Sequence, residues 1–478
     1  MKKGELIFIP SPVIGHLPST VEVGKLIVSR DDRLSITFLI TEPRSFDSKL
    51  ASYIESLVSS TLSNRLQFIK LPCLEPTPSE HPLDLGKLIE GQKPQVKKQV
   101  TKLIQTQNGP QLAGFVIDMF GTSMIDLANE FEVPTYLYLT SGATFLGVVF
   151  HLQSLHDEQN VDITEFDGSD AHLELPVLAN PVPAKVLPTP LLNKYWQPSN
   201  LAHARRFREA KGIIVNTFME LEPLAVNSLL IPPVYPVGPI LNLKSDSAER
   251  TGEADKKSEI MKWLDDQPPS SVVFLCFGSL GSFGADQVKE IACALELSGH
   301  RFIWSLQQTP PQVAAFGPST GYTNLVEILP QGFVDRTAET GKIIGWAPQV
   351  AILSHTAIGG FVSHCGWNST LESIWFGVPI AAWPMYGEQQ LNAFQMVVEL
   401  GLAVEIKMDY KRSFMDKSEG IVSFKEIERG ITSVMEHDSE VRKKMKKMSE
   451  SSRFALMEFG SSYSNLGRLI SEFVDNIS

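Results

Sequence analysis

Residues 346–389 read WAPQVAILSHTAIGGFVSHCGWNSTLESIWFGVPIAAWPMYGEQ, and this stretch decides the fold. Its middle contains a short apolar strand, residues 360–362, which runs directly into SHCGWNS at residues 363–369. A helix is predicted to open at Asn368. A strand that ends in glycine and small polar residues at a helix start exposes backbone N–H groups, and the helix dipole is positive there. The stretch therefore predicts a strand–turn–helix unit that suits a phosphate group.

The same alternation of short apolar runs and helical patterns extends through the chain. Strands are predicted at residues 6–10, 34–40, 113–117, 135–139, 213–217, 234–237, 272–277, 302–306, 343–344, 360–362 and 379–383. Helical patterns include residues 18–28, 285–297 and 463–477. Strands that alternate with helices imply parallel sheets with right-handed crossovers, so the predicted fold class is α/β.

One polar segment divides the chain. Residues 241–259 read LNLKSDSAERTGEADKKSE, which is charged, free of aromatic residues and typical of a linker. Because 478 residues exceed one ordinary core, we predict an N-terminal domain at 1–240, a C-terminal domain at 260–455 and a final helix at 456–478. Two doubly wound, Rossmann-like domains would face a cleft at the carboxyl ends of their sheets, where ligands bind.

Composition excludes several classes of function. The formal net charge of −12 argues against nucleic acid, which selects basic surfaces. The four cysteines form no C-x-x-C pair, as expected in a reducing cytosol. The N-terminal apolar run is too short for a signal peptide, and no stretch approaches the roughly 18 apolar residues of a membrane span. We expect a cytoplasmic monomer without a membrane span.

His16 lies in the loop SPVIGHLP, residues 11–18, just after the first predicted strand. Functional sites gather at the carboxyl ends of sheet strands, and an imidazole there can act as a general base near neutral pH. The alternative is a histidine that caps the following helix or lines a turn, and position alone favours this alternative.

Asp118 ends the predicted strand in GFVIDMF, residues 114–120. A carboxylate at a strand tip can accept the second N–H of a histidine, fix its tautomer and stabilise the imidazolium. The alternative is an N-cap for a helix that begins near Thr122, which these residues alone favour.

The stretch at residues 346–389 resembles the donor-binding signature of plant secondary-product UDP-glycosyltransferases, an inverting family, and the resemblance extends to both ends of the chain. It implies the glycosyltransferase-B architecture, with a UDP-sugar in the C-terminal domain and the acceptor in the N-terminal domain. The final helix would cross back to the N-terminal domain. The resemblance also implies that His16 is the catalytic base and Asp118 its orienting acid.

The resemblance assigns the donor contacts position by position. Trp346 would stack on uracil, Ala347 would read the uracil edge through its backbone, and Gln349 would contact the nucleoside. The remaining contacts fall into three groups: Ser279, His364, Gly366, Asn368 and Ser369 for the diphosphate; Glu372 for the ribose; Trp367, Glu388 and Gln389 for the sugar.

Some of these positions have structural alternatives. A core tryptophan is the alternative for Trp346. The spacing from Ser369 to Glu372 also fits a capping box. By composition alone, Glu388 and Gln389 would be ordinary exposed residues at a helix start.

Motifs for other chemistries are weak. The glycines at 278, 281 and 284 follow a strand but do not form G-x-G-x-x-G, which disfavours an NAD-dependent oxidoreductase. No D-x-D carboxylate pair is present, and His364 and Cys365 have no second ligand pair at zinc spacing. We therefore expect neither a metal nor another cofactor, with the diphosphate held by helix N-termini and polar side chains.

The resulting prediction is an enzyme that transfers glucose from UDP-glucose to a hydroxyl of a small lipophilic acceptor, with inversion. The opening of the chain and the Asp118 region look most like the family branch that acts on flavonoids, other phenolics and triterpenoids. The acceptor would contact residues 82–91, 141–145 and 182–196, which contain apolar and aromatic side chains. The alternative is a non-catalytic UDP-sugar sensor, which the presence of both His16 and Asp118 opposes.

Overall fold

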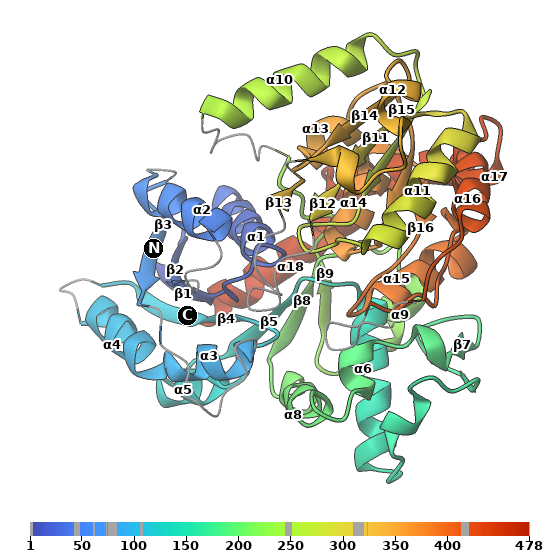
Figure 1. Ribbon diagram of the computed structural model, residues 1–478. Coiled ribbons are helices and arrows are strands. Elements are labelled where there is room, and N and C mark those ends of the chain that lie inside the picture. The colour runs from blue at the N-terminus through green and yellow to red at the C-terminus, as the bar shows by residue number, and fades with distance from the viewer. Residues whose placement is uncertain are drawn as a thin grey trace. The chain divides into compact units, whose positions relative to one another are not determined.

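The structure is a computed structural model that describes residues 3–42, 48–60, 63–72, 74, 84–105, 109–243, 251–308, 320–322, 324–412 and 420–477. It divides into two compact units. Unit 1 contains Met1–Thr164, Asn193–Asn242 and Phe454–Ser478, and unit 2 contains Glu165–Leu192 and Leu243–Arg453. Each unit is built around one parallel sheet (Figure 1).

The sheet of unit 1 has seven parallel strands in the order β3-β2-β1-β4-β5-β8-β9. Its strands are β1 (Gly4–Ile9), β2 (Leu34–Thr41), β3 (Leu66–Leu71), β4 (Gln111–Asp118), β5 (Thr135–Leu139), β8 (Gly212–Val215) and β9 (Val234–Pro236). The helices of the unit are α1 (Leu17–Arg30), α2 (Ser48–Ser59), α3 (Leu85–Gly91), α4 (Lys93–Ile104), α5 (Met124–Glu130), α6 (Ala143–Asp157), α8 (Gln197–Phe207), α9 (Pro223–Ser228) and α18 (Ser461–Asp475).

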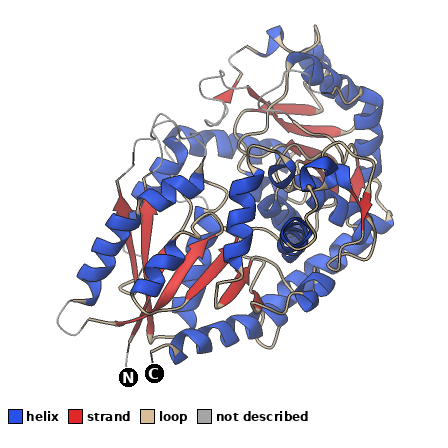
Figure 2. Cartoon of the chain, turned by 90° about the horizontal axis from the view of Figure 1, so that it is seen from below, coloured by secondary structure: helices blue, strands red, loops and turns tan. Residues whose placement is uncertain are grey.

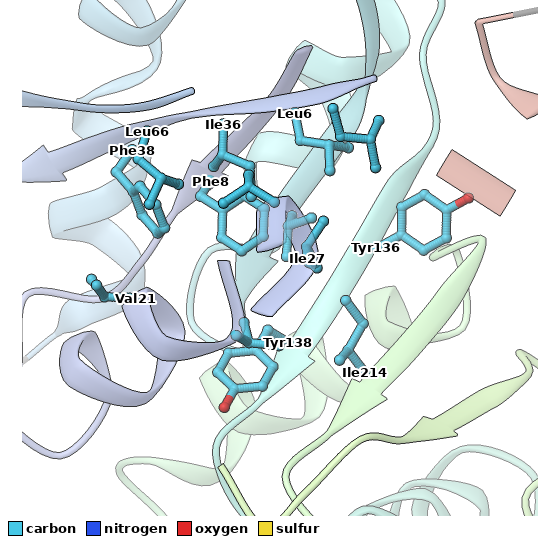
Figure 3. Packing of buried hydrophobic residues seen from close by; sticks show 14 of the residues in the cluster. Leu6, Phe8, Val21, Ile27, Ile36, Phe38, Leu66, Tyr136, Tyr138 and Ile214 are labelled. Carbon is cyan, nitrogen blue, oxygen red and sulfur yellow. The ribbon is translucent and has the colours of Figure 1, made fainter. Parts of the chain in front are cut away.

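The main core of unit 1 lies between one face of the sheet and helices α1, α2 and α18. Strand residues alternate between faces, so Leu6 and Phe8 of β1 point into this core while Glu5 lies on the opposite face. Figure 3 shows part of the cluster, which includes Phe8, Ile36 and Phe38. Helix α1 packs closely because a Cβ at Gly24 would lie only 2.5 Å from the Phe38 ring.

Helix α18 attaches the end of the chain to unit 1. The Phe473 ring meets Tyr136 of β5 edge to face, with centroids 4.7 Å apart. The Arg30 guanidinium of α1 lies 3.5 Å above the Tyr463 ring. The two chain ends lie side by side in Figure 2, and Ile477 packs against Gly4.

The sheet of unit 2 has six parallel strands in the order β14-β11-β10-β15-β16-β17. Its strands are β10 (Val272–Cys276), β11 (Arg301–Ser305), β14 (Gly341–Ile344), β15 (Ile358–Ser363), β16 (Ile380–Ala382) and β17 (Ala403–Glu405). The helices are α7 (Thr189–Leu192), α10 (Thr251–Asp265), α11 (Ala285–Ser298), α12 (Phe333–Arg336), α13 (Gln349–Leu353), α14 (Trp367–Phe376), α15 (Gln389–Phe394), α16 (Phe424–Met435) and α17 (Glu440–Leu456). Two short antiparallel pairs are β6 (His172–Leu173) with β7 (Val182–Pro183) and β12 (Gln307–Gln308) with β13 (Thr320–Gly321).

The predicted α/β class with two doubly wound parallel sheets is confirmed. The additions to the predicted set are β3 and β17 in the parallel sheets and β6, β7, β12 and β13 in the short antiparallel pairs. In the predicted linker, residues 244–250 lie outside the described part of the chain, and α10 begins at Thr251. The segment Glu165–Leu192 belongs to unit 2, although it precedes that linker.

Phe473 provides a test of how α18 contributes to unit 1. Its side chain is fully buried against Tyr136, so Phe473→Ala should lower the free energy of unfolding by about 3–5 kcal/mol. Phe459 is 85% exposed, and Phe459→Ala should change it by less than about 0.5 kcal/mol. Thermal unfolding followed by circular dichroism compares the two variants. Equal midpoints would show that α18 contributes little to the core.

Candidate active site

Strand order brings His16 and Asp118 together in unit 1. The chain runs from β1 to β2 and β3 on one side, then returns to β4 on the other side of β1. The loops after β1 and β4 diverge at such a reversal and leave a crevice at the carboxyl ends. His16 lies in the first loop and Asp118 ends β4, and His16 Nδ1 lies 2.7 Å from Asp118 Oδ2.

The Asp118 carboxylate is buried, and both of its oxygens accept hydrogen bonds. Oδ1 accepts hydrogen bonds from the Ser11 hydroxyl at 2.5 Å and the Phe120 N–H at 3.1 Å. Because a carboxylate is an acceptor, Oδ2 places the proton of His16 on Nδ1 and leaves Nε2 as the basic nitrogen. The helix-cap alternative for Asp118 is wrong, since Ser123 occupies the N-cap position of α5.

The His16 ring is held on two further sides. Thr140 Oγ1 lies 3.2 Å from Nδ1, and the Phe120 ring stacks on the imidazole at 5.7 Å. His16 occupies the N-cap position of α1, but its side chain makes no capping hydrogen bond there. The side chain is 20% exposed, whereas that of Asp118 is not exposed at all. Ring orientation therefore depends on Asp118 and not on the helix.

Unit 2 repeats the reversal between β10 and β15. Ser279 follows β10 and is exposed, and His364 follows β15 directly. A Cβ at Gly278 or Gly366 would lie 2.6 or 2.5 Å from His364 Nε2. The imidazole is thus packed between the backbones of two loops, and only glycine leaves room for it.

His364 is a buried, neutral imidazole. Burial lowers its pKa to about 4, so the ring is uncharged at neutral pH. Within the described part of the chain, its Nδ1 has no hydrogen-bond partner. A buried polar atom without a partner is costly, and a ligand oxygen at this position would satisfy it.

The backbone after His364 passes through the left-handed region at Cys365 before α14 begins. Cys365 has a φ of +59°, which costs a non-glycine residue about 1–3 kcal/mol. Gly366 is the N-cap of α14, and no side chain caps that end of the helix. Trp367 is buried, whereas Gly366 and Asn368 are half-buried. The first N–H groups of α14 and the positive end of its dipole therefore suit a phosphate.

Trp346 and Ala347 lie just beyond β14. The Trp346 side chain is 50% exposed, so the core alternative for this residue is wrong. Ala347 is buried and precedes the short helix α13. An exposed indole beside the carboxyl end of the sheet provides a flat surface for a planar ring.

Gln349, Ser369 and Glu372 form one polar cluster. Gln349 Nε2 donates to Ser369 Oγ at 2.9 Å and to Glu372 Oε2 at 2.7 Å. The capping-box alternative is wrong, because Gly366 and not Ser369 is the N-cap of α14. Desolvation raises the pKa of Glu372 to about 7, and the bond from Gln349 offsets part of this increase.

Gln389 is buried, so its alternative as an ordinary exposed residue is wrong. Its Oε1 accepts from the N–H groups of Met385 at 3.0 Å and Tyr386 at 3.1 Å. The side-chain acceptor is therefore occupied, the Nε2 amide also hydrogen-bonds the Tyr386 side chain, and one amide N–H remains as a donor. Glu388 is half-buried at the N-cap of α15, and its side chain makes no capping bond.

The three stretches predicted to contact the acceptor do not all lie in the same unit of the structure. Residues 82–83 lie outside the described part, Asp84 is the N-cap of α3, and residues 85–91 form that helix. Residues 141–145 enter α6, whose first N–H groups donate to the buried Glu222 carboxylate. Residues 182–192 belong to unit 2 and 193–196 to unit 1.

Three contacts involve residues that were not predicted: Ser11 and Thr140 contact the His16–Asp118 pair, and Asn392 Nδ2 donates to the Cys365 carbonyl at 3.0 Å. Thr140 follows β5, next to β4, so the strand-tip rule that found Asp118 also applies to it. Asn392 gives no such signal, because it lies inside α15. Among the described residues, no group of three or more His, Cys, Asp or Glu side chains is arranged to hold a metal ion. No helix in the described ranges is long and apolar enough to cross a membrane.

Comparison with known proteins identifies the fold. A family model described as UDP-glucoronosyl and UDP-glucosyl transferase matches residues 230–415. UDP-glycosyltransferase 71A15 of Malus domestica is 53% identical over 98% of this chain and 99% of its own length. UDP-glucose flavonoid 3-O-glucosyltransferase 6 of Fragaria ananassa is 55% identical over 98% of this chain and 99% of its own.

A solved structure agrees with these relatives. The crystal structure of UGT71G1 from Medicago truncatula, complexed with UDP-glucose, is 42% identical, with a TM-score of 0.85 over 98% of both chains. The glycosyltransferase-B architecture and the family resemblance expected from the sequence are confirmed. The chain belongs to the UDP-glycosyltransferase family, and the protein is a UDP-dependent glycosyltransferase.

Proposed function

We propose that the enzyme transfers glucose from UDP-glucose to a hydroxyl of a small lipophilic plant metabolite, such as a flavonoid or another phenolic compound. The observation that carries the proposal is the 2.7 Å contact between His16 Nδ1 and Asp118 Oδ2 at the strand reversal of unit 1. The relatives named for flavonoid 3-O-glucosyl transfer and for a UDP-glucose complex support the donor and acceptor classes.

The proposed donor contacts lie in unit 2. Trp346 stacks on the uracil, and Ala347 and Gln349 contact the base and nucleoside. Glu372 hydrogen-bonds the ribose hydroxyls through its carboxyl oxygens. The diphosphate contacts are Ser279, His364, Gly366, Asn368 and Ser369, and the sugar contacts are Trp367, Glu388 and Gln389.

The proposed chemistry is a single displacement. His16 Nε2 takes the proton of the acceptor hydroxyl while that oxygen attacks the anomeric carbon. Asp118 stabilises the imidazolium that forms, as the acid of a triad does. The bond to UDP breaks as the new bond forms, so an α-linked donor gives a β-glucoside.

The departing diphosphate is stabilised without a metal ion in this proposal. Its oxygens meet the N–H groups at the start of α14, the neutral His364 ring and the hydroxyls of Ser279 and Ser369. Preoriented dipoles in a partly dry site stabilise developing charge more strongly than water does.

We further propose that the enzyme works in the cytoplasm as a monomer. Free thiols at Cys276, Cys293 and Cys365 support a reducing compartment. An NAD-dependent oxidoreductase is excluded by family membership, whereas a UDP-sugar sensor is an outcome of the test below.

Product analysis tests the function. The protein is incubated with UDP-glucose and a panel of flavonoids, simple phenols and triterpenoid alcohols, and products are identified by mass and by the anomeric proton coupling. We expect hexosylated products with the β configuration. Binding of UDP-glucose with no product from any acceptor would support the sensor, and an α-linked product would contradict direct displacement.

Asp118→Asn tests the role of the carboxylate. The amide retains a hydrogen bond to His16 but cannot neutralise the imidazolium, so turnover should fall about 10²-fold. Glu5→Gln is the matched control, because Glu5 is also a buried carboxyl in unit 1, bonded to the hydroxyls of Ser35 and Thr37. We expect the control to keep wild-type turnover in steady-state assays. Wild-type turnover in Asp118→Asn would assign Asp118 a purely structural role.

Gln389→Glu tests how the sugar is recognised. The carboxylate still accepts from Met385 and Tyr386 but offers no amide donor to the sugar. Loss of one hydrogen bond to a buried partner should weaken UDP-glucose binding by about 1–3 kcal/mol. UDP alone serves as the internal control, and its affinity should not change. Calorimetric titration with both ligands measures the difference, and equal weakening of both would show that Gln389 does not read the sugar.

A further inference from the structure

The turn between β15 and α14 has an unusual backbone at Cys365. Its φ of +59° lies in the left-handed region, which glycine adopts readily and other residues seldom do. The Cys365 side chain is completely buried, so the residue is fixed in the core while its backbone forms the turn. Something in the surrounding structure must hold this conformation.

Two hydrogen bonds hold the Cys365 peptide groups. The Cys365 N–H donates to Ser363 Oγ at 3.1 Å, which is a local contact. The Cys365 carbonyl accepts from Asn392 Nδ2 at 3.0 Å, which is a contact from a separate helix, α15. Asn392 is buried, so its amide cannot exchange this bond for water.

The second bond sets the direction of a backbone donor. In a trans peptide, the C=O of one residue and the N–H of the next point in opposite directions. When Asn392 draws the Cys365 C=O toward α15, the Gly366 N–H points away from α15. In the described part of the structure this N–H makes no hydrogen bond. It belongs to the turn that also carries the unpartnered Nδ1 of His364.

We propose that Asn392 is a positioning residue of the donor site, which holds the left-handed Cys365 peptide so that the Gly366 N–H faces a phosphate oxygen. The inference rests on the proposed assignment of residues 364–369 to the diphosphate of UDP-glucose. Gln389 lies one helical turn before Asn392 in α15. One helix therefore positions both the turn proposed to bind the diphosphate and the Gln389 amide proposed to donate to the sugar.

A double-mutant cycle tests the inference through UDP affinity. Asn392→Ala removes the bond that holds Cys365, and UDP should bind about tenfold more weakly. Cys365→Gly makes the left-handed conformation accessible without that bond. In the Cys365→Gly background, Asn392→Ala should weaken UDP binding by less than about threefold. Calorimetry with UDP gives the four dissociation constants, and kcat/KM for UDP-glucose should fall in the same order as UDP affinity.

Gln390→Ala is the matched control. Gln390 is the buried amide two positions before Asn392, and its Nε2 donates to the Tyr410 carbonyl at 2.7 Å, outside the diphosphate turn. Its effect on UDP affinity should be the same in both backgrounds. Circular dichroism verifies that each variant is folded, and Asn392→Asp, which keeps the shape but lacks the amide donor, replaces any alanine variant that unfolds.

The outcomes separate this inference from the proposed function. Equal weakening by the Asn392 variant in both backgrounds, or unchanged UDP affinity in a folded Asn392 variant, would overturn the positioning role. Failure of the unmodified protein to bind UDP would overturn the proposed function instead.

Discussion

The reversal of strand order within each sheet is the constraint on which the rest of the structure depends. His16 and Asp118 are 102 residues apart in the sequence, yet their side chains meet at 2.7 Å because β4 returns to the other side of β1. The same reversal between β10 and β15 brings the Gly278 backbone against the His364 ring. Local features such as the Ser11 bond to Asp118 then refine contacts that topology has already created.

Because burial disfavours charge on titratable side chains, the proposed donor site offers oriented dipoles and little positive charge. Burial lowers the pKa of His364 to about 4 and raises that of Glu372 to about 7, so the ring is uncharged at neutral pH and the carboxyl is less ionised than an exposed one. Stabilisation of a diphosphate then depends on oriented N–H groups and hydroxyls, whose directions are set by backbone geometry. This is why a single residue in the left-handed region, Cys365, matters for the site.

The sequence predicts most of the fold because buried parallel strands read as short apolar runs. Of the two parallel sheets, it misses β3, an edge strand in which polar residues interrupt the apolar run and only the two ends are buried, and β17, which has only three residues. The pair His16 and Asp118 is predictable because one residue lies in the loop after a strand and the other ends a strand. The orientation of Gln389 is not, since its carbonyl oxygen is occupied by the turn at Met385 and Tyr386. The bond from Asn392 to Cys365 depends on a positive φ at a non-glycine residue, which has no sequence signal.

The proposed mechanism assigns proton removal to unit 1 and donor binding to unit 2. The most direct test is His16→Ala, with UDP-glucose affinity measured by calorimetry and turnover measured with an acidic phenol and an aliphatic alcohol. Donor affinity should be unchanged, and turnover should fall by about 10²–10⁴-fold, with a smaller loss for the phenol, which ionises more readily without a base. Wild-type turnover with both acceptors, or loss of donor binding, would contradict this mechanism.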